Sequence, residues 1–246
     1  SEGLCFYINL DRRADRRESM ERLASTHRWL STGMTRIAGV DGKELSWPQL
    51  VGNRLLAPEA EHEAIRAERL RRPTGGSSFA ERSCHMTLGA CGCALSHRKA
   101  WQSLVDSDAG WALVLEDDLS AVCPRFDDEL ASVLRVLPAA WHLCYLGFHS
   151  GEMLPEGTGF TGPLIHLDSD DGWVPGLYGY MLTKAFARTL LQRTLPMTAQ
   201  LDAVVGCLAA GLGCSYAVPS GQLLVFSAPP EESRDTDVQT FAEDMK

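Results

Sequence analysis

The sequence predicts an α/β fold, in which a mainly parallel central sheet is flanked by helices within a single domain, residues 1–246. Short apolar runs of β-forming residues alternate with stretches of helical spacing along the chain. Several of these runs end in polar residues, as strands do at the rim of a parallel sheet. A hydrophobic content of 45 % over 246 residues is enough for one substantial core.

The first 86 residues are expected to form two strands, a helix and a polar excursion. The run LCFYIN, residues 4–9, predicts a strand, and Asp11 stands where it can cap a helix whose apolar spacing covers residues 12–30. A second strand lies within residues 34–42, which end in an Asp-Gly turn. Residues 43–86 are charged and contain a Gly-Gly-Ser-Ser tract, so we expect a loosely helical excursion with a mobile tip.

The remaining sequence continues the alternation of helices and strands. A helix is expected over residues 87–108, where Gly89, Gly92 and Ala94 would permit close approach of backbone or ligand. The run WALVLE then predicts a buried strand. The later elements are a helix at 124–137, a strand at 141–147, loops at 150–176, a strand at 177–183, helices at 184–193 and 200–211, a strand at 214–218 and a polar tail.

Charge and hydropathy exclude several partners. The net charge of −9 and an isoelectric point near 5.3 argue against nucleic acid, whose phosphate backbone normally requires a basic face. We find no apolar segment of about 18–20 residues and no signal-like pattern at the first residues, so no transmembrane segment is predicted in this chain. These features favour a cytoplasmic location, or the Golgi or ER lumen if a targeting segment was trimmed before Ser1.

The eight cysteines are not arranged as a disulfide framework. Cys5, Cys93, Cys144 and Cys207 lie within apolar runs and are interpreted as small core residues. The Cys91-x-Cys93 pair has no matching second pair, which argues against a structural zinc site of the ribbon type.

Three consecutive carboxylates follow the WALVLE strand, at Glu116, Asp117 and Asp118. Asn9 and Asp41 also lie just past predicted strand ends, so all five can share one rim of the sheet. Carboxylate oxygens are the ligands that Mg²⁺ and Mn²⁺ prefer, and such ions keep positions open for substrate phosphates. In the alternative interpretation, one carboxylate caps a helix, another pairs with arginine and the third is solvated.

Four motifs resemble glycosyltransferase family 25, which includes bacterial lipooligosaccharide galactosyltransferases and procollagen galactosyltransferases. They occur in the family's order within about residues 4–120: YINLDRRADRRESM from Tyr7, AGVDGKEL from Ala38, GCALSHRKAW from Gly92 and ALVLEDDL from Ala112. The second half is similar more faintly, in WHLCYLG, LYGYMLTKAFARTLL and the terminal RDTDVQ, which resembles the family's Ser-Asp-Ile-Gln ending.

The resemblance implies a GT-A fold, a UDP-sugar donor that is usually UDP-galactose, inversion at the anomeric carbon and a divalent cation, Mn²⁺ or Mg²⁺. Asn9 and Arg12 would contact the uridine, and Arg16 or Arg17 the diphosphate, since guanidinium groups suit phosphate oxygens. Each arginine can instead belong to the solvated face of a helix. Asp41 would bind the ribose or uracil, or simply form its Asp-Gly turn.

Within the carboxylate triplet, the resemblance assigns Asp118 to the metal and Glu116 to the ribose or the metal shell. Asp117 points the other way if the strand continues, which makes it a structural residue. Ser96 and His97 belong to a matching motif and would hold the donor's sugar, with Arg98 or Lys99 assisting the diphosphate. A histidine on a helix is also common as a packing residue.

An inverting transfer needs a general base for the acceptor hydroxyl. Asp202 is the leading candidate, ahead of Asp170 and Asp171, which also read as an ordinary polar turn. The family's acid follows a proline more closely than Asp202 does here. Many GT-A enzymes add a late histidine ligand to the metal; none follows His166, so Asp237 or water would take that place.

The leading hypothesis is therefore a hexosyltransferase that moves galactose or glucose from UDP to a hydroxyl of a glycan, lipooligosaccharide or protein. Residues 1–120 would bind nucleotide sugar and metal, and residues 121–246 the acceptor. A catalytically inactive UDP-sugar-binding module of the same fold is the alternative. A nucleotidyltransferase or phosphatase is disfavoured because the sequence has neither a P-loop nor an Asp-x-Asp-x-Thr motif.

Overall fold

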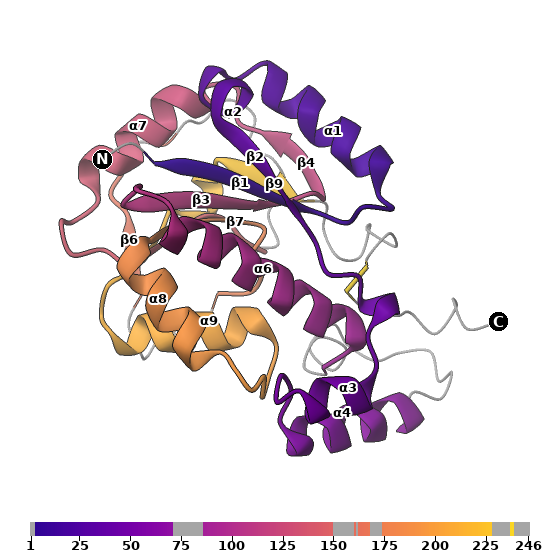
Figure 1. Cartoon of the computed structure of the whole chain (residues 1–246). Helices are drawn as coiled ribbons and strands as arrows, with labels where there is room; N and C mark the ends of the chain where they lie inside the picture. Colours follow the sequence, from indigo (N-terminus) through magenta and orange to yellow (C-terminus); the bar gives the residue numbers. More distant parts are fainter. Residues whose placement is uncertain are drawn as a thin grey trace.

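A mixed β-sheet with helices on both faces forms the body of the molecule (Figure 1). The computed structural model describes residues 3–70, 86–149, 160, 162–167, 174–227 and 237–238. Among these, no helix combines the length and the apolar character that crossing a membrane requires.

Seven strands make up the central sheet in the order β2-β1-β3-β7-β5-β8-β6. β1 pairs in parallel with β2 and with β3, and β5 pairs in parallel with β8. The other three pairs, β3 with β7, β5 with β7 and β6 with β8, are antiparallel. Five strands of the sheet therefore point the same way, and β6 and β7 run in the opposite direction. The predicted mainly parallel sheet is confirmed. The strands are β1 Leu4–Asn9, β2 Met34–Ala38, β3 Trp111–Glu116, β5 Leu143–Gly147, β6 Ile165–Leu167, β7 Gly179–Thr183 and β8 Ser215–Ala217.

Each face of the sheet has its own hydrophobic core. In β3, Ala112 and Val114 join the core under one helical layer, while Leu113 and Leu115 join the core under the other, as strand alternation requires. Figure 1 shows the two layers on opposite sides of the sheet. One layer holds α1 Ala14–Ser25, α2 Arg28–Gly33 and α7 Phe126–Val136; the other holds α6 Leu88–Asp106, α8 Lys184–Arg193 and α9 Leu201–Gly211.

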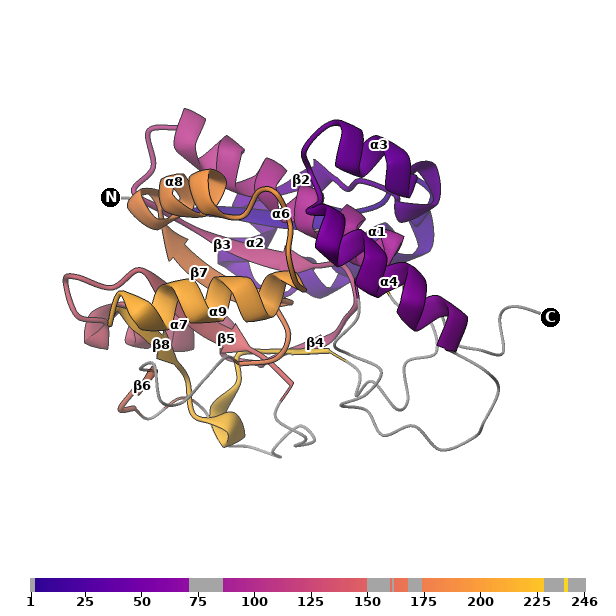
Figure 2. The same ribbon diagram turned by 90° about the horizontal axis from the view of Figure 1, so that it is seen from below.

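The polar excursion is helical where the structure describes it. After the short 3₁₀ turn η1 Gly42–Glu44, the chain forms α3 Trp47–Gly52 and α4 Pro58–Leu70, which lie together on the α6 side of the sheet (Figures 1 and 2). Leu50 and Leu56 are 1 % exposed and belong to the same core as α6, so α3 and α4 extend that core. The predicted mobile tip lies outside the described residues.

The helix expected over residues 12–30 is two helices, because α1 ends before Thr26 and α2 starts again at Arg28. The expected cap at Asp11 is also wrong. Arg13 occupies the N-cap position of α1, and the Asp11 carboxylate pairs with Arg36 in the middle of β2. The Asp11 carboxylate therefore pairs with an arginine of the neighbouring strand and does not accept a hydrogen bond from the N-terminus of α1.

The segment expected as a polar tail contains an additional strand. β4 Leu119–Val122 pairs antiparallel with β9 Val225–Ser227, which follows the 3₁₀ turn η2 Ser220–Gln222. Leu224 anchors the segment: its N–H donates to the carbonyl oxygen of Leu146 at 2.8 Å, and its own carbonyl accepts from Cys123 at 2.9 Å. The strand β6 was likewise missed within the expected loop at 150–176.

Only two of the four cysteines predicted to be core residues are so. Cys5 and Cys144 are at most 1 % exposed, whereas Cys93 is partly exposed and Cys207 is exposed on the outer side of α9. The described cysteines are free thiols. An apolar run predicts that a segment lies near the core, but it does not predict which side chains of a helix face the core.

Replacement of Leu224 by alanine tests whether β9 is part of the core. Leu224 is fully buried, so Leu224→Ala is expected to lower the free energy of unfolding by about 2–5 kcal/mol in urea denaturation. The matched control is Leu212→Ala, because Leu212 is 47 % exposed. This substitution should change the free energy of unfolding by about 0.5 kcal/mol or less. Equal effects of the two substitutions would show that residues 219–227 do not contribute to the core as described.

Candidate active site at the carboxyl ends of β1 and β3

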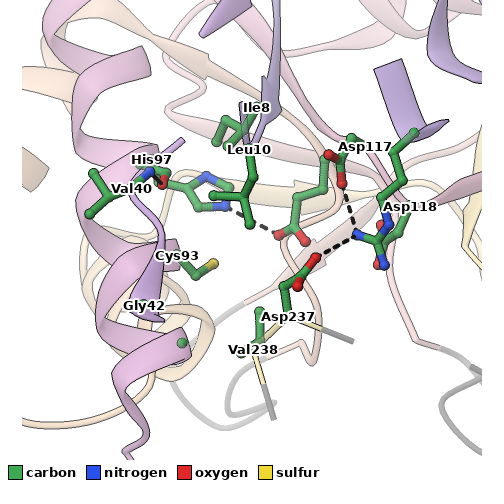
Figure 3. Close-up of a pocket in the computed structure, with 14 residues that line it drawn as sticks. Ile8, Leu10, Val40, Gly42, Cys93, His97, Asp117, Asp118, Asp237 and Val238 are labelled. Carbon is green, nitrogen blue, oxygen red and sulfur yellow. Dashed lines mark hydrogen bonds and ion pairs between the residues drawn. The ribbon is translucent and has the colours of Figure 1, made fainter. Parts of the chain in front are cut away.

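A pocket opens where the carboxyl ends of β1 and β3 lie side by side (Figure 3). β1 lies between β2 and β3, and the chain leaves β1 into α1 on one face but enters β3 from α6 on the other. Such a switch point is where open α/β sheets bind ligands. This hollow, called here the rim pocket, is partly open to solvent, and its empty space of about 570 Å³ includes part of that solvent.

The three carboxylates after β3 diverge around the rim pocket. An oxygen of Glu116 lies 3.2 Å from Nε2 of His97 on the α6 side. Asp117 points to the α1 side, as strand alternation predicts, and accepts hydrogen bonds from Asn9 at 2.7 Å and Arg16 at 2.9 Å. Glu116 and Asp117 therefore have partners of their own.

Asp118 differs from its two neighbours. Its Oδ1 atom is buried, and among the described residues it has no hydrogen-bond partner. Burial, together with the charge of Glu116, raises the pKa of Asp118 to about 7. Burial is the largest single influence on Glu116 and acts to raise its pKa, but the hydrogen bond and charge of His97 and the charges of His149 and Arg16 together hold the pKa of Glu116 below its usual value.

The orphaned oxygen of Asp118 and the carboxylate of Glu116 fit a hard divalent cation. Carboxylate oxygens are the donors that Mg²⁺ and Mn²⁺ prefer, and a bound cation would offset the cost of two partly buried charges. Glu116 and Asp118 are therefore the side chains that would hold such a cation.

A buried hydrogen-bond chain fixes the orientation of His97. Its Nδ1 atom lies 2.8 Å from the hydroxyl of Tyr180, and this hydroxyl also accepts a hydrogen bond from Nε1 of Trp101 at 2.8 Å. The three side chains are at most 1 % exposed. Sequence reasoning missed them because Tyr180 lies in an apolar strand and Trp101 on a helix with no sign of its partner; the available clue was that a buried hydroxyl and a buried indole N–H both need partners.

Three arginines just before and within the first turn of α1 converge on Asp237, far along the chain, which is labelled in Figure 3. Arg12 pairs with both Asp41 and Asp237. Arg13 donates to the second oxygen of Asp237 at 2.9 Å, and Arg16 lies 3.9 Å from it. Both oxygens of Asp237 are thus paired with guanidinium groups, so its predicted role as a metal ligand has no support in this geometry.

Two glycines of α6 allow the backbone to close around the rim pocket. A Cβ atom on Gly89 would lie 2.3 Å from the carbonyl oxygen of Asp237, and one on Gly92 would lie 2.5 Å from that of Val40. The Ser96 hydroxyl donates to Gly92 and accepts from the Val40 N–H, which ties the loop after β2 to α6. The predicted close approach at Gly89 and Gly92 is confirmed, with backbone as the neighbour.

Several predicted residues hold the walls in place. Asn9 is 1 % exposed; its amide donates to Asp117 and to the backbone of Arg13, and its oxygen accepts from Arg36. Asp41 accepts from the N–H of Lys43, so it does form the turn that its Asp-Gly sequence indicates. The hydrogen bond from Arg12 holds the pKa of Asp41 below its usual value.

The expectation that Arg98 or Lys99 assists a diphosphate is wrong for this geometry. Arg98 donates to the Leu191 carbonyl at 3.0 Å and to the Thr194 hydroxyl at 2.6 Å, on the α8 side of the helix. Lys99 donates to the carbonyl of Ala38 at 3.0 Å. Successive helical residues point about 100° apart, so only His97 of this group faces the rim pocket.

Asp202 lies in the first turn of α9, outside the lining of the rim pocket. It accepts hydrogen bonds from the N–H of Gly176 at 3.2 Å and of Ala203 at 2.8 Å. Burial raises the pKa of Asp202, and the charge of Glu116 adds to this effect. Asp170 and Asp171 lie outside the described residues.

His149 was not singled out in the sequence. Burial lowers the pKa of its imidazole, while the charges of Glu116 and Asp202 oppose this shift, so His149 lies near both. It packs against Gly176, where φ is +89° and a Cβ atom would come within 2.8 Å of the imidazole. A lone histidine after a strand gives no sign of this placement.

Comparison with known proteins identifies the family. The family model described as "Glycosyltransferase family 25 (LPS biosynthesis protein)" matches residues 4–146. The chain belongs to glycosyltransferase family 25. The match includes His97, Glu116 and Asp118, whereas Asp202 and Asp237 lie beyond it. The mixed sheet flanked by helices is compatible with the GT-A-like fold expected for such a protein.

Relatives in family 25 are longer than this chain. A "Glycosyltransferase 25 family member" of Drosophila melanogaster is 35 % identical over 146 residues, which is 58 % of this chain and 20 % of the relative. "Procollagen galactosyltransferase 1" of Danio rerio is 30 % identical over 189 residues, 76 % of this chain and 28 % of the relative. "Procollagen galactosyltransferase 2" of Homo sapiens is 30 % identical over 145 residues, with 58 % and 20 % covered. The chain thus spans between a fifth and just over a quarter of these relatives.

Asp118→Asn tests the raised pKa of Asp118 in metal-free protein. A carboxyl group whose folded-state pKa is raised from 3.8 to about 7 destabilises the fold as pH rises through that window. In EDTA at pH 8, Asp118→Asn should therefore raise Tm by about 2–4 °C or more, equivalent to at least about 1 kcal/mol. At pH 4 the two proteins should melt together.

The control for this measurement is Asp128→Asn, whose side chain is 75 % exposed and should shift Tm little at either pH. A stabilisation of the Asp118 variant that is the same at pH 4 and pH 8 would contradict the raised pKa.

Proposed function

We propose that this chain transfers a hexose from a UDP-sugar to a hydroxyl acceptor, with inversion, and uses Mn²⁺ or Mg²⁺ in doing so. The observation that carries the proposal is the buried oxygen of Asp118 beside Glu116, which has no hydrogen-bond partner in the described part of the chain and lies at a strand-end pocket lined by Arg16. Galactose is the leading donor sugar because two of the relatives are named as procollagen galactosyltransferases. Glucose is the alternative.

Glu116 and Asp118 would hold the cation with carboxylate oxygens. When bound, such a cation neutralises a diphosphate and makes UDP a better leaving group. The Asp117 carboxylate stays with Asn9 and Arg16, so it keeps the end of β3 attached to β1 and α1.

The donor's diphosphate would lie against Arg16 of the rim pocket and near Arg12, which binds Asp237 of the same lining. Arg16 lines the pocket, and Arg12 already binds carboxylates in the geometry that phosphate oxygens use. Ile8, Leu10 and Val40 supply an apolar part of the lining, against which a uracil ring can pack.

His97 and Asp202 would act on the reacting sugar and on the acceptor. His97 holds Glu116 by a hydrogen bond and is itself fixed by Tyr180, so it can orient the donor sugar at the pocket. Asp202 would accept the proton of the acceptor hydroxyl as the new glycosidic bond forms and UDP departs. The electrostatic influence of Glu116 and His149 on Asp202 supports this assignment.

The acceptor proposed for this chain is a hydroxyl group of a glycan, a lipooligosaccharide or a protein. The family model's description names LPS biosynthesis, and two relatives are named for procollagen. These names support both glycolipid and protein acceptors and do not favour one of them.

UDP release from a panel of UDP-sugars tests the proposal. With Mn²⁺ we expect release from one hexose donor, and this should stop in EDTA and fall by about 100-fold or more in Asp118→Ala, because a metal ligand acting in the transition state is removed. Asp128→Ala, on an exposed surface, is the control. Metal-dependent UDP binding without turnover of any donor would instead support an inactive UDP-sugar-binding module.

Asp202→Asn tests the general base separately. The substitution keeps the shape of the side chain but removes its basicity, so kcat for transfer should fall by about 10²–10⁴-fold while metal-dependent binding of UDP is unchanged. Steady-state transfer kinetics and UDP titrations measure the two effects. Wild-type kcat in Asp202→Asn would exclude Asp202 and direct attention to the residues at 170–171.

A further inference from the structure

We propose that Cys93, His97 and Glu116 form a binding site for a thiophilic divalent cation, Zn²⁺, which shares Glu116 with the site for the hard cation. The three residues each offer a ligand atom, and these atoms lie within 4.8 Å of one another. All three line the rim pocket, so a cation can reach them from solvent (Figure 3).

The fold brings the ligands together from two elements. Cys93 and His97 are one turn apart on α6, at the i and i+4 spacing that places two side chains on one face of a helix. Glu116 comes from the end of β3. Ligands at ~2.0–2.3 Å from a tetrahedral zinc ion lie about 3.5 Å apart, so closure requires movements of about 1 Å by the side chains.

The donor set selects the ion. Sulfur and imidazole nitrogen are the ligands of zinc, whereas Mn²⁺ and Mg²⁺ prefer oxygen. Three protein ligands leave the fourth tetrahedral position open toward the rim pocket, where water or a phosphate oxygen can bind. When zinc binds, the thiol of Cys93 gives its proton to solvent and its sulfur becomes a thiolate ligand.

The surroundings of His97 are those of a metal-bound histidine. Histidine ligands are usually held through their second ring nitrogen, and here Nδ1 lies 2.8 Å from the Tyr180 hydroxyl. This oxygen has two lone pairs, so it can accept from Nδ1 while it accepts from Trp101, which leaves Nε2 free for the ion. The Nε2 contact with Glu116 would then be replaced by the metal.

Zinc and the hard cation would compete, because each needs Glu116. Zinc at Cys93, His97 and Glu116 removes a carboxylate that Asp118 needs as its partner ligand. The expected consequence is that zinc displaces Mn²⁺ from the pocket, since nitrogen and sulfur sites bind Zn²⁺ far more tightly than Mn²⁺.

Cobalt serves as the spectroscopic probe of this site, because Co²⁺ takes the same ligands as zinc and a thiolate–cobalt bond absorbs in the near ultraviolet. Titration of the whole chain with Co²⁺ alone should produce this band at one equivalent, and Zn²⁺ should abolish it. The band should be lost in Cys93→Ser and kept in Cys207→Ser, in which an exposed cysteine is replaced. No band in the wild type, or a band retained in Cys93→Ser, would overturn the proposal.

Two further variants keep the test valid if Cys93→Ser is misfolded, which its thermal melt would reveal. His97→Gln and Glu116→Gln each remove one ligand and should weaken Co²⁺ binding by at least about tenfold, the loss that even outer partners of a metal site cause. Unchanged binding in either variant, with the wild-type melting curve, would contradict the assignment of that ligand.

The effect on activity rests on the proposed function, whereas the cobalt spectrum does not. In the Mn²⁺-dependent UDP-release assay, Zn²⁺ should inhibit the wild type and inhibit Cys93→Ser at least about tenfold less strongly, each relative to its own activity without zinc. A cobalt band without any UDP release would support the metal site and contradict the proposed transferase activity. Equal inhibition of UDP release by zinc in the two proteins would contradict the proposal that zinc bound through Cys93 inhibits the reaction.

Discussion

The hydrogen bonds that Asp117 accepts from Asn9 and Arg16 are the interaction on which the rim pocket depends. They join the end of β3 to the end of β1 and to α1, so three elements meet at one carboxylate. Asn9 extends the connection, because it also binds the backbone of Arg13 and accepts from Arg36 of β2. With Asp117 fixed on this side, the neighbouring Glu116 is directed toward α6.

This division gives the three carboxylates three different electrostatic environments. Asp117 has an arginine, Glu116 has the imidazole of His97, and Asp118 has a buried oxygen without a partner in the described part of the chain. A buried carboxylate that lacks a cation is costly, and folded proteins keep such a group where a ligand compensates it. The identity of the compensating ion depends on which neighbours of Glu116 contribute, oxygen from Asp118 or sulfur from Cys93.

Much of the fold could be predicted because local pattern and tertiary structure agree. The strand at residues 4–9 and the helix at 184–193 have the boundaries expected from their apolar runs and capping residues. Prediction failed where a distant partner decides, since Asp11 binds Arg36 and the backbone of Leu224 forms hydrogen bonds with Leu146 and Cys123. No local sequence pattern contains these long-range contacts.

The candidate site divides in the same way. The motif around Glu116 and Asp118 could be read from a strand ending in carboxylates, because strand ends converge in an α/β sheet. The directions of Cys93 and Arg98 could not, because each depends on the face of α6 that meets the pocket. The roles of Tyr180 and Trp101 could not be predicted, because they depend on hydrogen bonds that join Trp101, Tyr180 and His97 in the folded structure.

The pairing of β4 with β9 has a consequence for the order in which the molecule is assembled. β4 begins directly after Asp118, and β9 is made from residues 225–227, near the last part of the chain that the structure describes. During synthesis the carboxylates therefore emerge long before the strand that holds their loop in place, and a contact so distant in sequence forms late. Until residues 225–227 leave the ribosome, β4 has no partner strand, and the loop that carries Asp118 lacks this support.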